Sequence, residues 1–295
     1  MSRGENSLVI RVHEDPSLFR EAVNFTMAET AFAPRLIEKD YFCTVLLAYL
    51  AGAMDDRLVF KGGTCLAKVH ADFYRLSEDL DFVIAVSVTS TRSHRSKLAA
   101  GVKKAVGLLP ERLPGFRLID PLKGANNSTQ YIAVVGYPSV IRQQEETIKI
   151  EVGLREPLLT PVVKGSTRTI MLDPVSGKPL VHPFPVRCIS KREALAEKFR
   201  AALSRHEAAI RDFFDIDYAI RKLGLRPRGA AFIRLIRHKL DMPGNDPVDV
   251  SGERLKALRQ QLESRLKPVL RAKDFSDFDL DCAFRTVADV AALIR

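Results

Sequence analysis

Hydrophobic and polar positions repeat along the chain with two different periods, and the change between them divides the sequence. Up to about residue 186, alternating segments typical of strands are mixed with segments that have helical spacing. The segment 156–185 is rich in Pro and Gly, which predicts an excursion or a linker. We expect strands over 57–60, 80–88, 116–122, 130–137 and 147–154, and helices over 16–31, 36–54, 64–74 and 93–109.

From residue 189 onwards the spacing is helical throughout. The sequence therefore predicts an α/β (α+β) architecture, with a sheet domain and its helical lead-in over residues 1–186. A basic helical domain is expected to follow over residues 187–295. Its apolar residues recur every three or four positions over 191–205, 207–223, 229–240, 252–270 and 281–294.

The composition is that of a globular protein with a substantial core. Of 295 residues, 46% are hydrophobic and 28% are charged, which excludes a disordered chain. The most apolar segment, 41–54, is too short to span a bilayer and predicts a buried helix, and no signal peptide is visible. The four cysteines are scattered without a CxxC pair, so their spacing indicates neither a zinc site nor a disulfide framework. A reduced, cytoplasmic location is expected.

The positive charge of the chain is concentrated in one stretch. Residues 187–273 contain 21 Lys and Arg against 11 Asp and Glu, whereas the remainder of the chain has 25 of each. This asymmetry favours an anionic partner for the C-terminal part. Nucleic acid is the first candidate and a membrane surface the second, and the alternative is that the charge only keeps this part of the chain soluble. A second basic face is expected on helix 93–109, from Arg95, Lys97, Lys103 and Lys104. The best candidates for RNA contacts in the C-terminal stretch are Arg234, Arg237, Lys239, Arg254, Arg265 and Lys267.

A glycine pair separates the first expected strand from the helix that follows it. In Phe60-Lys61-Gly62-Gly63-Thr64, the glycines permit a tight turn and let backbone N–H groups approach an oxyanion. The helix start adds partial positive charge, and Thr64 has a hydroxyl suited to a cap or to a phosphate oxygen. The spacing is not that of a Walker A loop, so a purely structural turn is the alternative.

Three acidic residues occur where neighbouring strands are expected. Asp79 and Asp81 lie two positions apart, so their side chains share one face of a strand while Leu80 and Phe82 face the core. Such carboxylates repel each other unless a cation such as Mg²⁺ lies between them, and two solvated acids on an edge strand are the alternative. In the strand Thr147–Val152, Lys149 and Glu151 share the face opposite the core. If this strand lies beside the first, Glu151 completes a cluster able to hold two metals about 4 Å apart.

Together these residues carry a resemblance to a known family. Lys61-Gly62-Gly63-Thr64, followed by the run from Arg75 to Phe82, resembles the signature of the AbiEii/AbiGii toxin family of the DNA polymerase β-like nucleotidyltransferase superfamily. The resemblance covers roughly residues 35–220, with Thr64 where many relatives have Ser. Later motifs that match are Ile148-Lys149-Ile150-Glu151, Ala196-Glu197-Lys198-Phe199-Arg200-Ala201 and Arg211-Asp212-Phe213-Phe214-Asp215.

The resemblance implies a fold, an activity and partners. It implies a mixed polymerase β-like sheet with flanking helices, followed by a helical bundle, and an enzyme that transfers nucleotides from an NTP with Mg²⁺ or Mn²⁺. The acceptor would be RNA, with the 3′ acceptor end of tRNA, on which several relatives act, as the first candidate. The protein would be the toxin of a toxin–antitoxin or phage-defence system and would bind a cognate antitoxin. No association with a membrane is expected.

The resemblance also implies roles for individual residues. Asp79, Asp81 and Glu151 would bind metal, and with Lys198 and Asp215 they would form the catalytic set. Ser77, which precedes Asp79 by two positions, is a candidate for regulatory modification or simply a local hydrogen-bonding residue. The nucleotide would be bound by Lys61, Gly62, Gly63, Thr64, Ser77, Lys149, Lys198 and Asp212.

Helical spacing supports part of this assignment from the residues alone. Lys198 lies off the apolar stripe of its helix, and Asp212 and Asp215 share one face of the next helix, where they could meet Lys198. Solvated surface charges are the alternative.

Two other functions are kept open: a nucleotidyltransferase for small molecules of the antibiotic type, and a nucleic-acid-binding module without catalysis. The basic C-terminal stretch argues against the first, and retention of all three acids argues against the second.

Overall fold

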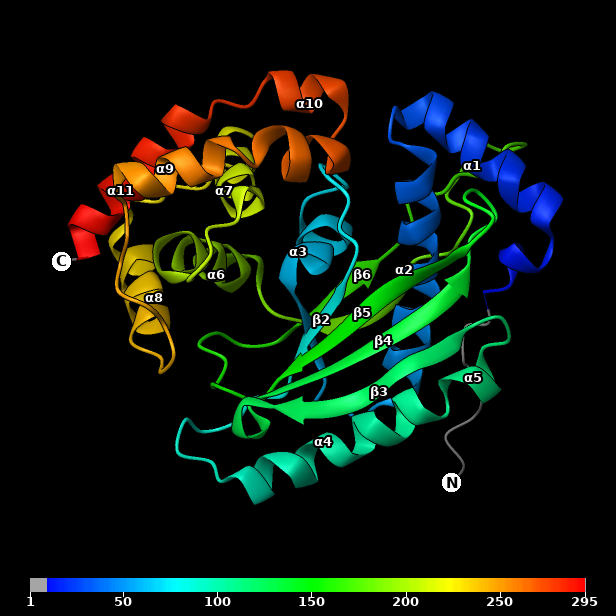
Figure 1. Cartoon of the computed structure of the whole chain (residues 1–295), viewed down its shortest axis with the longest axis horizontal. Helices are drawn as coiled ribbons and strands as arrows, with labels where there is room; N and C mark the ends of the chain where they lie inside the picture. The colour runs from blue at the N-terminus through cyan, green and yellow to red at the C-terminus, as the bar shows by residue number, and fades with distance from the viewer. Residues whose placement is uncertain (1–9, 295) are drawn as a thin grey trace. The chain divides into compact units, whose positions relative to one another are not determined.

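The computed structural model describes residues 10–294, which form two compact units (Figure 1). The first unit comprises the described chain up to Leu158 together with Val162–Ile189. The second comprises Leu159–Pro161 and the described chain from Ser190 onwards. Each unit has its own core of buried apolar residues. Among residues 10–294, no helix combines the length and apolarity that crossing a bilayer requires.

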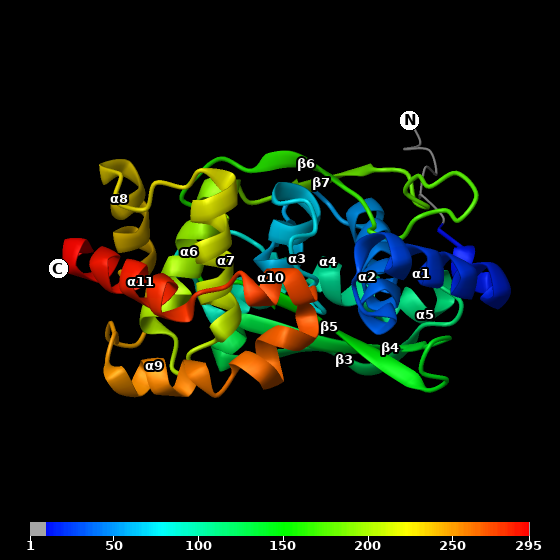
Figure 2. The same ribbon diagram turned by 90° about the horizontal axis from the view of Figure 1, so that it is seen from above.

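A mixed seven-stranded sheet forms the centre of the first unit, with the strand order β3-β4-β5-β2-β1-β7-β6. β2 pairs with β5 in parallel and with β1 in antiparallel, while β1 pairs with β7 in parallel. Figure 2 shows β6 and β7 next to each other at the other edge from β3. The strands are β1 Val59–Lys61, β2 Leu80–Val83, β3 Arg117–Ala125, β4 Gln130–Pro138, β5 Glu145–Gly153, β6 Val163–Thr167 and β7 Phe184–Cys188.

Alternation along β2 and β5 separates a buried face from a polar one. Leu80 and Phe82 on β2 are buried, as are Ile148, Ile150 and Val152 on β5. The residues between them therefore share the opposite face of the sheet. This burial confirms the side-chain directions predicted from sequence and leaves the acidic residues together on one face.

Helices pack around the sheet of the first unit. α4 runs along β3, and the buried α2 contacts α1, α4 and β7 (Figure 1). Among the charged residues buried on α2, Asp40 forms an ion pair of 2.6 Å with the buried Lys68. The helices are α1 Pro16–Thr30, α2 Pro34–Ala53, α3 Gly62–Cys65, α4 Arg92–Gly107 and α5 Leu109–Arg112, and a π-helical segment, Leu66–His70, continues from α3.

The second unit is helical within the described residues. Aromatic side chains form much of its core, with Phe199 packed edge-on against Phe232 and Phe213 stacked on Phe284. The backbone N–H groups of Leu159 and Thr160 donate to the buried Glu193, which attaches this short segment to the helices. The helices are α6 Lys191–Ser204, α7 Ile210–Leu223, α8 Ala230–Leu240, α9 Gly252–Arg259, α10 Ala272–Ser276 and α11 Leu280–Ile294.

Four expected elements differ from the structure. The helix predicted over 64–74 ends early, because Asp72 and Phe73 adopt positive φ angles. The strand predicted over 80–88 ends at Val83. The segment 156–185, expected to be an excursion or a linker, contains β6 and the beginning of β7. The single helix predicted over 252–270 ends at Arg259 and continues as π-helical and 3-10 segments, the last of which contains Pro268.

Candidate functional site

Strand register brings a lysine and two acids side by side across three strands. On the antiparallel pair β1–β2, Lys61 lies opposite Asp81, and on the parallel pair β2–β5, Asp81 lies opposite Glu151. Asp79 precedes β2 by one residue. The sequence-derived condition that the two acidic strands be neighbours is therefore met, and Asp81 occupies the middle of the group.

The carboxyl group of Asp81 is held in an environment that disfavours its charge. Burial raises the pKa of Asp81 to about 6, and the nearby carboxylates of Glu151 and Asp79 act in the same direction. Lys61 and Lys149 oppose this shift without cancelling it. A cation bound beside Asp81 would relieve the repulsion between its carboxylate and those of Asp79 and Glu151.

Lys149 is the cation on the same face of β5. Its Nζ lies 3.3 Å from Glu151 Oε2. Burial acts to lower the pKa of Lys149, but the carboxylates of Asp79, Glu151 and Asp81 outweigh it, so the pKa is raised. Lys149 therefore stays charged and neutralises part of the acidic group.

Neighbouring side chains leave no room for a side chain at either glycine of the turn. Gly62 has a φ of +78°, and a Cβ built on it would lie 2.1 Å from Asp81 Oδ2. A Cβ on Gly63 would lie 2.6 Å from the Nη2 atom of Arg75 and 3.1 Å from Ser77 Oγ. The turn thus passes directly beside Asp81, at a distance that only a residue without a side chain permits.

The remaining residues of the motif have contacts that bear on their expected roles. Thr64 is buried, and its hydroxyl donates to the backbone oxygen of Asp79, so it joins the glycine turn to the acidic strand. Ser77 is half-buried beside Gly63. Glu78 forms ion pairs with Arg35 at 2.7 Å and Lys39 at 3.3 Å, which attach this segment to α2. Binding of a nucleotide by Thr64 and Ser77 stays a prediction.

The carboxylates of this group suit a hard divalent cation by their chemistry. Oxygen ligands from Asp and Glu are those that Mg²⁺ and Mn²⁺ take. Within residues 10–294, however, Asp79, Asp81 and Glu151 do not bring one oxygen each within 4.8 Å of the others. A cation bound by all three would therefore require a rotated side chain.

A second group of predicted residues meets in the second unit. Lys198 on α6 forms ion pairs of 2.8 Å with both Asp212 and Asp215 on α7. Both aspartates are buried, so they are not the solvated surface charges of the alternative interpretation. Burial alone would raise the pKa of Asp212, but Lys198 and Arg205 outweigh it and lower that pKa. The contact anticipated from helical spacing is thus present.

Several basic residues expected to contact RNA are buried instead. Lys239 forms ion pairs of 2.7 Å with Glu193 and 3.1 Å with Glu197, and none of its side chain is exposed. The Arg254 guanidinium donates to the backbone oxygens of Ala202 and Arg205. The expectation that these two cations contact RNA was wrong, because both are held inside the unit. The candidates that remain exposed are Arg234, Arg237, Arg265 and Lys267.

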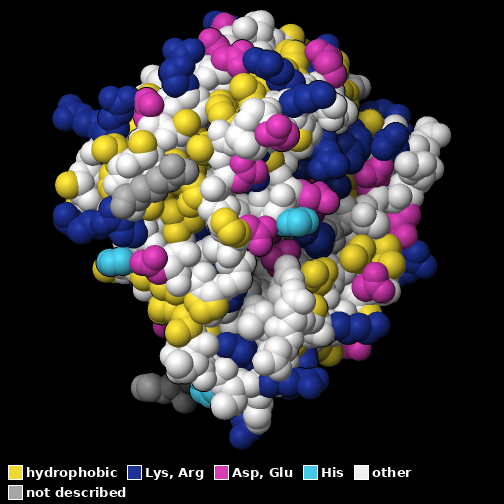
Figure 3. Space-filling model, turned by 60° about the vertical axis from the view of Figure 1, so that its left-hand side comes forward, with side chains coloured by type: hydrophobic (Ala, Val, Ile, Leu, Met, Phe, Trp, Pro, Cys, Tyr) yellow, Lys and Arg dark blue, Asp and Glu magenta, His cyan; other side chains and the backbone are white. Residues whose placement is uncertain are grey.

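The basic face expected on helix 93–109 is also smaller than predicted. Arg95 is buried and donates to the Val88 carbonyl, and Lys103 lies 4.8 Å from the centroid of the Tyr131 ring. Lys97 and Lys104 remain exposed. On the face shown in Figure 3, Lys and Arg side chains stand in several separate groups with Asp and Glu side chains among them. Basic charge is therefore distributed over this face in more than one place.

Solved structures share the fold of this chain. A protein of Helicobacter pylori called JHP933 matches with a TM-score of 0.50 and 17% identity, over 89% of this chain and 93% of that one. A presumed nucleotidyltransferase of Helicobacter pylori matches with a TM-score of 0.51 and 17% identity, over 89% of this chain and 96% of that one. At this identity the likeness concerns the fold alone.

Comparison with families is more specific. No curated protein matches the chain significantly. The model of the family described as nucleotidyl transferase AbiEii toxin, type IV TA system, matches residues 45–290, which include both groups of site residues. The chain therefore belongs to the AbiEii family of nucleotidyltransferase toxins of type IV toxin–antitoxin systems.

Proposed function

We propose that this toxin transfers a nucleotide from an NTP to RNA, with the 3′ acceptor end of tRNA as the first candidate acceptor. The observation that carries the proposal is the register that places Lys61, Asp81 and Glu151 side by side, with the Gly62 turn against Asp81. A glycine turn provides room for phosphates next to carboxylates. That combination is what phosphoryl transfer requires.

A divalent cation fits the acidic group. Asp79, Asp81 and Glu151 offer oxygen ligands. Burial, together with the carboxylates of Glu151 and Asp79, raises the pKa of Asp81 despite the nearby Lys61 and Lys149. We therefore propose Mg²⁺ or Mn²⁺ as the cofactor. When bound, it supplies charge neutralisation for the pyrophosphate leaving group and lowers the pKa of the attacking hydroxyl.

Residues of this chain hold the reactants. The turn at Gly62 and Gly63, with Lys61 and Lys149 as nearby cations, is proposed to bind the triphosphate, with Thr64 and Ser77 contributing hydroxyl groups. In the second unit, Asp212 and Asp215 hold Lys198 between them at 2.8 Å, which orients its ammonium as a point charge for the nucleotide. The exposed arginines and Lys267 of the second unit are proposed to bind RNA phosphates.

The decisive experiment offers both substrate classes to one preparation. The purified chain is incubated with Mg²⁺ and each labelled NTP in turn, with either total tRNA or a panel of aminoglycosides as acceptor. We expect label on tRNA, no label on the drugs, and none with excess chelator. Label on a small molecule alone would favour the antibiotic-type alternative, and RNA binding without transfer would favour a non-catalytic module.

Growth provides an independent test of the toxin. Expression in a host that lacks the cognate antitoxin should arrest growth, and co-expression of that antitoxin should restore it. The variant Asp81→Asn should be harmless at equal protein level. Arrest by this variant would separate toxicity from nucleotide transfer.

A further inference from the structure

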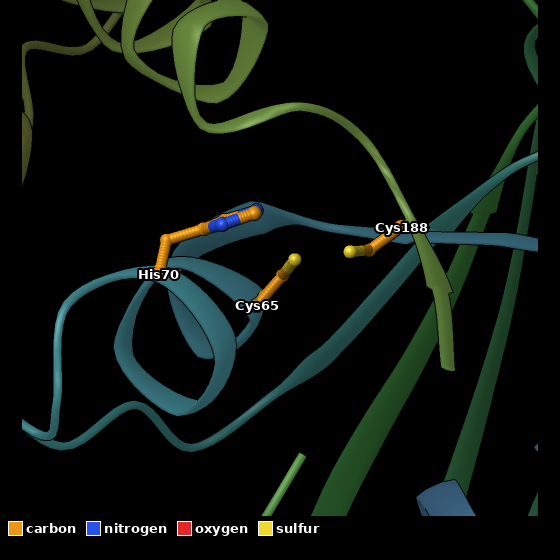
Figure 4. A group of neighbouring side chains, drawn as sticks. All are labelled: Cys65, His70 and Cys188. Atoms are coloured by element: carbon orange, nitrogen blue, oxygen red, sulfur yellow. The ribbon is translucent and has the colours of Figure 1, made fainter. Parts of the chain in front are cut away.

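Three soft metal-ligating side chains converge near the glycine turn of the first unit. The donor atoms of Cys65, His70 and Cys188 all lie within 4.8 Å of one another, and Figure 4 shows the two thiols directed towards each other. Both cysteines are fully buried, and His70 is half-buried. In the part of the chain that the structure describes, no other set of three His, Cys, Asp or Glu side chains meets this closely.

Strand pairing brings these residues together although they are far apart in the sequence. Cys188 ends β7 and lies opposite Phe60 on the parallel strand β1, and the Ile189 N–H donates to the Phe60 carbonyl at 3.0 Å. β1 leads directly through the glycine turn into α3, which carries Cys65. A Cβ on Gly165 of β6 would lie 3.0 Å from Cys188 Sγ, so this glycine leaves room for the sulfur.

The chemistry of the donor set is that of a zinc ligand set. Two thiolates and an imidazole nitrogen are ligands that zinc takes in proteins. The Nε2 atom of His70 lies 2.9 Å from the Ile189 carbonyl. An N–H donated there leaves the lone pair on Nδ1, and such an outer carbonyl is a usual partner of a metal-bound histidine.

We propose that Cys65, His70 and Cys188 bind one zinc ion through two sulfurs and one ring nitrogen. Three protein ligands leave a fourth position for a water molecule. The site is distinct from the acidic group, whose oxygen ligands suit Mg²⁺. Because the ion would join α3 to β7, it would brace the helix that begins at Gly62 and so hold the turn against Asp81. The proposal stands independently of the proposed reaction.

The first test uses the wild-type chain without any substitution. The full-length protein is purified without an affinity metal and without chelator, in the presence of a thiol reductant, and its zinc content is measured by mass spectrometry. We expect about one zinc per chain, as for a single site. Replacement by Co²⁺ should give the near-ultraviolet charge-transfer absorption of thiolate bound to cobalt, and Zn²⁺ should displace it.

Matched variants locate the metal. Cys188→Ser and Cys65→Ser should each weaken zinc affinity by at least about 10–100-fold, the range known for loss of a supporting outer group. Cys43→Ser is the control, because Cys43 is equally buried but lies outside the cluster. It should keep the zinc, as should Asp81→Asn. Added Zn²⁺ should raise the melting temperature of the wild type and of Cys43→Ser, but not that of Cys188→Ser.

Three results would overturn the proposal. One is a reduced wild-type protein that holds no zinc and shows no thiolate–cobalt absorption. Another is a zinc content and affinity that Cys65→Ser and Cys188→Ser leave unchanged, since the metal would then lie elsewhere. The third is a disulfide between Cys65 and Cys188 in protein purified anaerobically, which would assign the pair to redox chemistry. None of these results would affect the test of nucleotide transfer.

Discussion

Asp81 is the residue on which the charges of the acidic group and of its two lysines act together. It has Lys61 on one neighbouring strand and Glu151 on the other, and its pKa is raised to about 6 by burial and by like charge. Alternation along the sequence was sufficient to predict which side chains share this face. It could not predict that Gly62 passes within reach of Asp81, since that depends on the antiparallel pairing of β1 and β2.

Substitution of Asp81→Asn should abolish catalysis while the fold is retained. Asn has nearly the same shape but cannot neutralise a cation, and loss of such an electrostatic contribution lowers rates by at least about 10²–10³-fold. The measurement is the initial rate of label transfer, together with the melting temperature. Asp120→Asn, which changes an exposed carboxylate on β3, is the matched control and should leave the rate unchanged. Near wild-type transfer by Asp81→Asn would refute the assignment.

Asp212 should make stability depend on pH in a defined direction. Its folded-state pKa lies below the ordinary value of 3.8, because Lys198 and Arg205 outweigh burial. The stabilisation is therefore present above about pH 4 and is lost as the pH falls through the lowered pKa. Asp212→Asn should reduce the free energy of unfolding at pH 7 by about 1.5–3 kcal/mol, typical of a hydrogen bond to a charged group.

Denaturant unfolding of the full chain at several pH values checks this prediction. The difference between wild type and Asp212→Asn should be constant from pH 7 to about pH 4 and should shrink below it. Asp241→Asn, at an exposed carboxylate of the same unit, should show no comparable difference. A difference that grows on acidification would mean that the Lys198 pair does not stabilise the fold.

At the scale of elements, the glycine turn between β1 and α3 can be tested against a matched turn. Gly62 and Gly115 both have positive φ angles, of +78° and +90°, but only at Gly62 does a Cβ meet another atom within 4 Å. Both Ala variants carry the cost of a left-handed backbone, about 1 kcal/mol. Gly62→Ala alone should also displace Asp81 and reduce transfer by at least about 10²-fold. Equal activity of the two variants would show that the close approach is not needed.

Sequence patterns predicted long elements better than short ones. The expected strands over 130–137 and 147–154 correspond to β4 and β5. Buried positions alternate over the whole of β5 and over the first six residues of β4. β6 and β7 were missed because each has only five residues and they include Gly165 and Pro185, which indicate loops when they are read locally. These two strands complete the sheet beside β1. Their absence from the prediction is why the meeting of Cys65 and Cys188 could not be anticipated.

At the scale of the whole molecule, formal charge proved a poor guide to surface charge. Lys239 contributes to the basic excess of residues 187–273, yet it lies in the core with Glu193 and Glu197. A signal was available, because Lys239 follows Phe232 and Ile236 at helical spacing on the apolar stripe of α8. Pairing with α6 could not be deduced from that spacing, since it depends on which helices become neighbours. The exposed basic surface of the second unit is correspondingly smaller than the charge count suggests.

RNA affinity should therefore depend on the exposed cations of the second unit that the structure leaves available. Arg234 and Arg265 are both exposed, and each phosphate of single-stranded RNA that a cation neutralises adds about −0.7 to the slope of log affinity against log salt. The double variant Arg234→Glu/Arg265→Glu should weaken tRNA binding and flatten the slope by about 0.7 for each phosphate that is no longer neutralised. NTP binding should be unchanged, because neither arginine belongs to the residues proposed to bind the nucleotide.

The control for this RNA prediction must change the net charge equally, because any charge reversal weakens attraction to a polyanion at long range. Lys97→Glu/Lys104→Glu on α4 does so in the first unit, where both lysines are exposed. Filter binding of labelled tRNA at four or five salt concentrations gives both slopes. If the second unit binds RNA, only the arginine pair changes the slope, whereas both pairs change affinity modestly at low salt. A slope that changes with the lysine pair alone would move the RNA surface to α4.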